Sequence, residues 1–249
     1  MKIYDTLIVG SGSGYFSIGY AAARPDTIIC EEHQICDTGF YLPLKGFKYH
    51  PYTPQTHDGE VLLNIFNSMS LFVGGMQNTN GFEFAICKYV MKKDLDILLK
   101  CRVIDTQKTE NGIYDVTIQT NEGLTHLFAR KILSTRDSSL SKRFTVLFID
   151  EDIESSKEKL LGAFEKSEIE PAFYKGRYAL HIPVNGLDEN SIKLLVYEKW
   201  KSLDINAKIL YMAPIFYPDQ PSNPLCDAYY DNPIKAFEAG YLYGKEADR

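Results

Sequence analysis

The hydrophobic pattern of the first thirty residues predicts a strand, a helix and a second strand in direct succession. Tyr4–Val9 (YDTLIV) has the apolar character of a buried strand, and Thr27–Cys30 (TIIC) has it again. Between them, Phe16–Arg24 has the small and apolar residues of a closely packed helix. The glycine-rich segment Gly10–Tyr15 (GSGSGY) joins the first strand to this helix. This order is the layout of a dinucleotide-binding βαβ unit.

The next hundred residues change pattern several times. Cys36–Thr56 has neither a helical nor an alternating period and predicts a long ordered loop. Gly74-Gly75 is expected to end the helix that follows, and Asn121-Glu122-Gly123 is a hairpin signal. The elements predicted are helices over Gly59–Phe72 and Phe82–Lys93, then strands over Asp96–Val103, Ile113–Gln119 and Thr125–Leu133.

A smaller set of alternating elements follows, and the chain ends in a helix. The predicted elements are strands over Phe144–Asp150, Tyr178–Val184 and Ala207–Met212, and helices over Glu154–Glu168 and Asp188–Leu203. In the last helix, Asp231 or Asn232 serves as the N-cap and Pro233 takes the first position. Its small residues Ala236, Ala239 and Gly240 predict close packing against a neighbour.

The glycine turn and the acid after the second strand have a common chemistry. A turn without side chains lets backbone N–H groups and a helix N-terminus approach a pyrophosphate, and the acid can bind ribose hydroxyls. Glu31 lies 21 residues after Gly10 (31 − 10), close to the roughly 20 expected for that acid. Tyr15 departs from the pattern, because glycine or alanine is expected there. Its ring could tilt the helix or partly fill the cofactor site. The alternative to dinucleotide binding is a protein that keeps this fold but has a degenerate nucleotide site.

Composition narrows the class of protein. The chain has 249 residues, 45% hydrophobic and 24% charged, which suits one large or two small globular domains. A net charge of −6 without clustered Lys or Arg argues against nucleic-acid binding. Five cysteines without a CxxC pair indicate neither a zinc site nor a redox dithiol. We expect no metal, no membrane span, no leader peptide and a cytoplasmic protein.

These motifs resemble those of the FAD-dependent oxidoreductase superfamily, the group with a glutathione-reductase-like FAD domain. In that family a helix and strand lead to a segment whose backbone meets the adenine, here matched by Leu98–Val103. A β-meander follows and usually ends in an apolar-Ala-Thr-Gly motif. The corresponding stretch here is Ile132–Asp137 (ILSTRD), with Arg136 in place of the glycine.

The resemblance continues at the C-terminus. The family's last segment carries a Gly-Asp pair whose acid contacts the ribityl chain, followed by a helix aimed at the flavin. Asp227 matches that acid, and Cys226 replaces the glycine. The resemblance covers residues 1 to about 137 and 210 to 249, and it rests on the order of elements more than on exact motifs.

The resemblance implies an α/β fold: a glutathione-reductase-like Rossmann FAD-binding domain with a β-meander, plus a small inserted α+β substrate domain. The FAD domain would be split over residues 1–139 and 208–249, and the substrate or cap domain would span 140–207. The implied cofactor is FAD. The residues expected to bind it are Gly10, Gly12, Ser13, Gly14, Glu31, Glu32, Val103 and Asp227.

The implied function is that of an oxidoreductase acting on a small organic molecule by hydride transfer through the flavin. The alternatives are a non-catalytic or degenerate subunit of the same fold that binds a partner protein, and a simpler NAD-binding Rossmann enzyme. No catalytic residue is assigned. His50, His57 and His181 are candidates for proton transfer, and Cys36 for a flavin contact, each with an ordinary structural role as the alternative. Clustered tyrosines near the C-terminus make a homo-oligomer or hetero-oligomer plausible.

Overall fold

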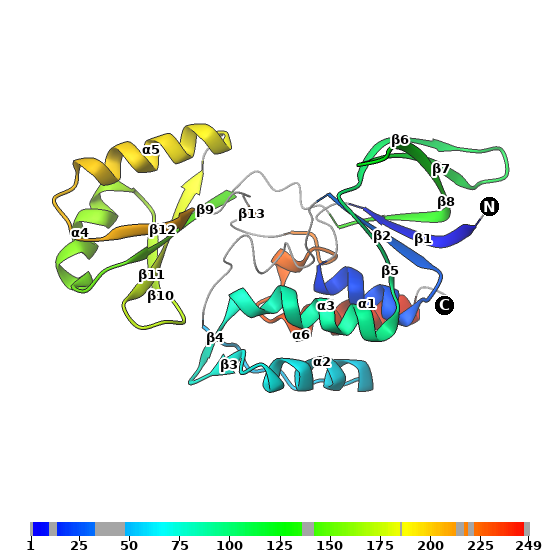
Figure 1. Cartoon of the computed structure of the whole chain (residues 1–249), viewed down its shortest axis with the longest axis horizontal. Coiled ribbons are helices and arrows are strands. Elements are labelled where there is room, and N and C mark those ends of the chain that lie inside the picture. The colour runs from blue at the N-terminus through cyan, green and yellow to red at the C-terminus, as the bar shows by residue number, and fades with distance from the viewer. Residues whose placement is uncertain are drawn as a thin grey trace.

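The computed structural model describes residues 2–9, 14–32, 48–135, 142–184, 186–212, 217–218 and 222–246. These residues form two large sheets, each with its own helices, and a two-stranded hairpin. Figure 1 shows the two sheets at opposite ends of the view, the N-terminal one on the right and the later one on the left. The mixed α/β class expected from the sequence is confirmed.

The first sheet combines parallel strands with a meander. Its order is β5-β2-β1-β8-β7-β6. Strands β5, β2, β1 and β8 run parallel to their neighbours, and β8, β7 and β6 form the antiparallel meander predicted from the sequence. The strands are β1 Ile3–Val9, β2 Thr27–Glu31, β5 Asp96–Leu99, β6 Arg102–Lys108, β7 Tyr114–Thr120 and β8 Gly123–Ser134.

The meander curls back over one face of the parallel strands. Leu7 and Ile28 from the parallel strands are buried in one cluster with Val116 and Ile118 of β7. The single strand expected over Asp96–Val103 is in fact two, because Lys100 adopts a left-handed conformation (φ 53°) that turns the chain from β5 into β6.

Four helices cover the other face of this sheet. They are α1 Tyr15–Ala23, α2 His57–Ser68, α3 Phe82–Lys93 and α6 Pro233–Glu246. In Figure 1, α1, α3 and α6 lie next to the sheet and α2 lies beyond them. The core between them contains Ile8 and Ile29 of the sheet with Phe16, Phe66 and Phe237 of the helices. No helix of the described part of the chain is long and apolar enough to cross a membrane.

The region after α2 differs from the sequence-based expectation. The helix ends at Ser68 rather than Phe72, because Ser70 takes a left-handed conformation (φ 53°). A short hairpin follows, β3 Phe72–Val73 and β4 Met76–Gln77. Gly74 and Gly75, with φ of 58° and 77°, form the turn of this hairpin and do not cap the helix. A 3₁₀ turn over Thr79–Gly81 then leads into α3.

The second sheet is antiparallel, with the order β10-β11-β9-β12, and β13 pairs with β9 as well. The strands are β9 Lys142–Ile149, β10 Glu168–Pro171, β11 Arg177–Val184, β12 Lys208–Met212 and β13 Tyr217–Pro218. Because β12 and β13 bond to β9, this sheet extends past residue 207, where the sequence placed the boundary between domains.

Two helices cover one face of the second sheet. They are α4 Ile153–Ala163 and α5 Glu189–Ser202. Asp188 caps α5, accepting hydrogen bonds from the N–H groups of Asn190 and Ser191. Helix α4 ends five residues before the predicted Glu168, because that residue starts β10. Phe144, Phe148 and Trp200 are buried between the sheet and these helices.

Helices α1 and α6 pack with their backbones in contact. Gly19 of α1 lies against the carbonyl of Phe237, and Gly240 of α6 lies against the carbonyl of Phe16. A Cβ atom built at either glycine would stand 1.9 Å from the carbonyl oxygen. The small-residue face predicted for the last helix therefore makes a reciprocal contact that joins the two ends of the chain.

Replacing either glycine by alanine should separate the helices. We expect Gly19→Ala and Gly240→Ala to lose about 3 kcal/mol, the upper end of overpacking costs, and to lower the melting temperature by about 6 °C or more. The matched control is Gly162→Ala in α4, where a Cβ meets nothing within 4 Å. That change should be neutral or stabilise by about 0.5–1 kcal/mol. Equal melting temperatures for the three variants would contradict this account of the contact.

Candidate functional site

The carboxyl ends of four strands meet at one edge of the first sheet. In the sheet, strand β1 lies between β2 and β8. The chain continues from β1 to β2 on one side, and it later comes back to β8 on the other side of β1. Such a reversal of strand order opens a crevice in which α/β proteins bind ligands. The register places Val9 beside Ser134 and Glu31 beside Leu99 at this edge. Helix α1 is the next element after β1, and its N-terminus lies at the same edge.

Part of the predicted site lies outside the described residues. Gly10, Gly12 and Ser13 of the turn belong to this part, as do Cys36 and Arg136. Gly14 is described and is the N-cap residue of α1. Thr135, which matches the threonine of the meander motif, is buried and donates its N–H to the carbonyl of Val9 at 2.9 Å.

Asp227 binds directly to the N-terminus of α1. Its two carboxylate oxygens accept hydrogen bonds from the N–H of Tyr15 at 2.5 Å and from the N–H of Phe16 at 2.8 Å. The side chain is buried, and a Cβ on Gly14 would lie 2.4 Å from one of the oxygens. The negative carboxylate satisfies two of the otherwise unpaired N–H groups of the helix and faces its positive end.

The ring of Tyr15 packs away from the turn. It is completely buried, its hydroxyl donates to the carbonyl of Phe82 at 2.8 Å, and its ring stands edge-on to Phe66 and Phe82. The expectation that this ring could occupy the cofactor site is therefore wrong. Tyr15 is instead an anchor between α1, α2 and α3.

Glu31 ends β2 as a completely buried acid, while Glu32 beside it is exposed. The carbonyl of Glu31 accepts the N–H of Cys101 at 2.9 Å, which brings the segment between β5 and β6 alongside it. Val103 follows on β6, partly buried and opposite Ile118. The fold thus brings Glu31 and the predicted adenine segment together.

Cys30 and Cys101 form a contact that was not predicted from the sequence. Cys30 on β2 and Cys101 after β5 are both buried in one cluster. The hydrogen bond between their thiols, with burial, raises the pKa of Cys30, and the same bond lowers the pKa of Cys101 despite burial. They are 71 residues apart, so no local spacing could signal them. Among the described residues, no group of three His, Cys, Asp or Glu side chains could hold a metal ion.

The three candidate histidines have different surroundings. His57 lies in the first turn of α2 with its side chain 84% exposed, and His50 is about half exposed, 4.0 Å from Asp231. His181 is buried on β11, on the face opposite α4 and α5. Its ring nitrogens contact Thr145 at 2.9 Å and Glu170 at 3.0 Å. Because both ring nitrogens of His181 have protein partners, the structure favours an ordinary structural role for this residue over proton transfer.

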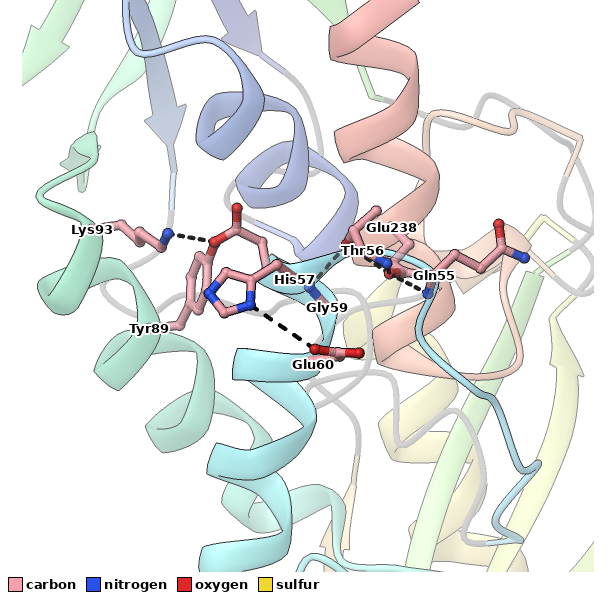
Figure 2. A network of polar contacts seen from close by, with 9 residues as sticks. Gln55, Thr56, His57, Gly59, Glu60, Tyr89, Lys93 and Glu238 are labelled. Carbon is pink, nitrogen blue, oxygen red and sulfur yellow. Dashed lines mark hydrogen bonds and ion pairs between the residues drawn. The ribbon is translucent and has the colours of Figure 1, made fainter.

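Glu238 is a completely buried acid in the middle of α6. As Figure 2 shows, its carboxylate meets the segment that leads into α2. It accepts hydrogen bonds from the N–H groups of Gln55 and Thr56 at 2.7–2.9 Å, from the Thr56 hydroxyl at 2.7 Å and from the Tyr52 hydroxyl at 2.8 Å. Burial and this hydrogen bond raise the pKa of Tyr52 to about 12. Thr56 in turn caps α2 through the N–H of Gly59 at 3.0 Å.

An ion pair joins the first turn of α2 to the end of α3. Asp58 pairs with Lys93 and accepts a hydrogen bond from the Tyr89 hydroxyl at 2.9 Å. Burial alone would raise the pKa of Asp58, but the bonds from Lys93 and Tyr89 outweigh it and hold the pKa below its ordinary value of 3.8. Neither Glu238 nor this pair was identified from the sequence, since an acid within a helix gives no sign of its partners.

Removing the charge of Glu238 should loosen the entry to α2. In Glu238→Gln an amide group would face buried N–H donors, and we expect a loss of about 2 kcal/mol or more, or roughly 4–8 °C in melting temperature. Glu246→Gln, at the exposed end of the same helix, is the control and should change little. The assignment is wrong if the two variants melt together.

Asp58→Asn should change how stability depends on pH. The pKa of the Asp58 carboxyl is lower in the folded protein than its ordinary value of 3.8. Its ionised form therefore stabilises the fold above pH 3.8, and this stabilisation is lost as the pH falls through the pKa of the folded state. We expect Asp58→Asn to cost about 1–3 kcal/mol at pH 7, and the gap to the wild type to narrow as the pH falls below about 4. Urea unfolding at pH 7, 5 and 3 measures this, with the exposed Asp26→Asn as control. A gap at pH 3 as large as that at pH 7 would count against the ion pair.

No protein-family model and no curated protein sequence matches the chain. Solved structures do match it. One is p-nitrophenol 4-monooxygenase PnpA from Pseudomonas putida DLL-E4, with 11% identity over 98% of this chain and 77% of that chain and a TM-score of 0.56. Another is a flavoprotein/dehydrogenase from Cytophaga hutchinsonii, with 12% identity, 98% and 77% coverage and a TM-score of 0.51.

A third similar structure is aklavinone-11 hydroxylase in a ternary complex with FAD and aklavinone. It shares 11% identity over 99% of this chain, with a TM-score of 0.52, and this chain spans only 62% of its length. Identities this low show the fold alone. The described chain therefore has a fold like that of flavoprotein hydroxylases, and the finer glutathione-reductase-like assignment stays a prediction from the sequence.

Proposed function

We propose that the chain is a FAD-binding oxidoreductase that acts on a small organic molecule. The observation that carries this proposal is the arrangement at the carboxyl edge of the first sheet. A buried acid, Glu31, ends β2 next to the strand-order reversal, and Asp227 reaches this edge from the far end of the chain. The fold likeness to a hydroxylase that binds FAD supports the same cofactor.

The proposal assigns each part of the cofactor to residues of this chain. Glu31, with Glu32 beside it, would bind the adenosine ribose, and the backbone at Val103 would meet the adenine. Asp227 belongs to the segment proposed for the ribityl chain. The turn residues Gly10, Gly12, Ser13 and Gly14 would surround the pyrophosphate. When bound, the flavin would supply the hydride transfer, while the protein binds and orients it.

The residues of this chain fit the ribose end of FAD better than its pyrophosphate end. The ribose end fits, because a buried acid at the end of β2 lies beside the segment proposed for the adenine. The pyrophosphate end does not fit as the chain stands, because the Asp227 carboxylate already takes the N–H groups of Tyr15 and Phe16.

The second candidate is a non-catalytic subunit that keeps the fold and binds a partner protein. The specific observation that favours it is that both helix N-termini expected to face the cofactor are capped internally. Asp227 caps α1, and the Asn232 side chain caps α6 through the N–H groups of Ile234 at 2.8 Å and Lys235 at 3.3 Å.

The absorption spectrum of the purified protein separates these two candidates. We expect flavin bands, or their appearance after added FAD is bound, and release of FAD on heat denaturation. A colourless protein that fails to take up added FAD would reject the flavoenzyme and leave the non-catalytic subunit.

Glu31 tests the adenosine end of the site. Replacing it by glutamine removes a charged acceptor for the ribose hydroxyls, and we expect FAD binding about 10–100-fold weaker by titration. Glu110→Gln, at the exposed turn between β6 and β7, is the control and should bind as the wild type does. Melting temperatures establish that both variants fold. Unchanged FAD affinity in a folded Glu31→Gln would remove Glu31 from the site.

A further inference from the structure

The second sheet has a cavity at one end of β9, apart from the proposed nucleotide site. Its volume is about 400 Å³, which lies within the range of pockets that hold small organic ligands. The cavity lies where β9 leads into α4 and where β12 begins. Its wall includes Asp150, Glu151 and Asp152 between β9 and α4, with Asn206 and Lys208 at and just before the start of β12.

Asp150 contributes to this cavity a buried carboxylate oxygen that has no partner. The residue is only 3% exposed, and its Oδ1 accepts the N–H of Asp152 at 2.9 Å. Its Oδ2 is buried and has no hydrogen-bond partner among the residues that the structure describes. Burying a charged oxygen without a donor is unfavourable, so such an atom indicates a group that the folded chain does not itself supply.

The backbone holds Asp150 at this position. Its N–H donates to the carbonyl of Gly176 at 3.0 Å. The preceding residue, Ile149, is paired with Arg177 of β11 on one side and with Lys208 of β12 on the other. A strand end that is bonded on both sides is rigid, so the Asp150 carboxylate has little freedom to reach another donor of the chain.

The cavity also keeps charges of opposite sign apart. Glu151 and Asp152 add two exposed acids to the wall that Asp150 belongs to. Lys208, likewise exposed, lines the same cavity, yet it forms no ion pair with any of these acids in the described part of the chain. The cavity therefore offers both an unpaired carboxylate and an unpaired ammonium group to a single ligand.

We propose that this cavity binds a free amino acid, whose ammonium group pairs with Asp150 and whose carboxylate pairs with Lys208. An ammonium group brings a positive charge and three N–H donors, which an unpartnered carboxylate oxygen requires. A metal ion fits less well, because no group of three His, Cys, Asp or Glu side chains among the described residues could hold one. The proposal is independent of FAD binding, since no residue proposed for FAD lines the cavity.

A thermal-shift screen of the wild-type protein against each of the twenty amino acids tests the proposal. We expect at least one of them, at saturating concentration, to raise the melting temperature by about 2–4 °C or more. Its N-acetyl derivative has no ammonium group and should leave the melting temperature unchanged. The proposal is overturned if no amino acid produces a shift, if the N-acetyl derivative shifts the protein equally, or if calcium chloride alone does so.

Asp150→Asn should have two opposite effects. We expect the amino acid found in the screen to bind at least about tenfold more weakly in a calorimetric titration, because the charged acceptor is gone. Without ligand, the variant should melt about 2–4 °C higher than the wild type, because no charge is then buried without a partner. Glu165→Gln removes an exposed charge just after α4, outside the cavity, and should change neither quantity. Wild-type affinity in the folded Asp150→Asn, or a lower melting temperature, would overturn the proposal.

Lys208→Met tests the other end of the ligand and stays informative if Asp150→Asn does not fold. We expect it to weaken binding of the free amino acid about threefold to tenfold. The amide of the same amino acid has no carboxylate, so it should bind the wild type and Lys208→Met equally. Lys201→Met, an exposed change on α5 outside the cavity, is the control. Undiminished binding of the free amino acid by Lys208→Met would reject the proposed pairing.

Discussion

The backbone contact between α1 and α6 is the constraint on which the candidate site depends. Gly19 and Gly240 each lie against a carbonyl of the other helix, with no space for a side chain. This packing holds the last helix of the chain beside the first one. The segment just before α6 is thereby brought to the N-terminus of α1, where Asp227 binds. Without the contact, the N-terminus of α1 and the C-terminal acid would have no fixed relation.

Buried side chains bind backbone N–H groups where three helices of this part of the molecule begin. Asp227 caps α1, Glu238 meets the segment entering α2, and Asn232 caps α6. Burying a carboxylate is unfavourable unless it is fully hydrogen-bonded, and helix N-termini offer several donors aimed at one point. These buried polar groups therefore stabilise the starts of three helices.

Local patterns were sufficient for most of the elements. The βαβ unit, the meander, α3 and the capped α5 follow from apolar period and from capping residues, which act within a few positions. The errors occurred where a single backbone conformation decided the outcome. Ser70 ended α2 early, and Lys100 divided one expected strand into two, each by adopting a positive φ that apolar periodicity does not encode. The roles proposed for Glu31, Val103 and Asp227 remain predictions that binding experiments must test.

The sequence by itself determined the order of the elements and the position of an acid at the end of β2, because both depend on neighbours along the chain. Only the tertiary structure decided what the polar groups bind. From the sequence, the Tyr15 ring could have tilted α1 or partly filled a cofactor site, and in the structure it packs among α1, α2 and α3. Asp227 meets α1 across more than two hundred residues, and Glu238 meets α2 across about as many. Such partners come together through helix packing, and no spacing within the sequence records them.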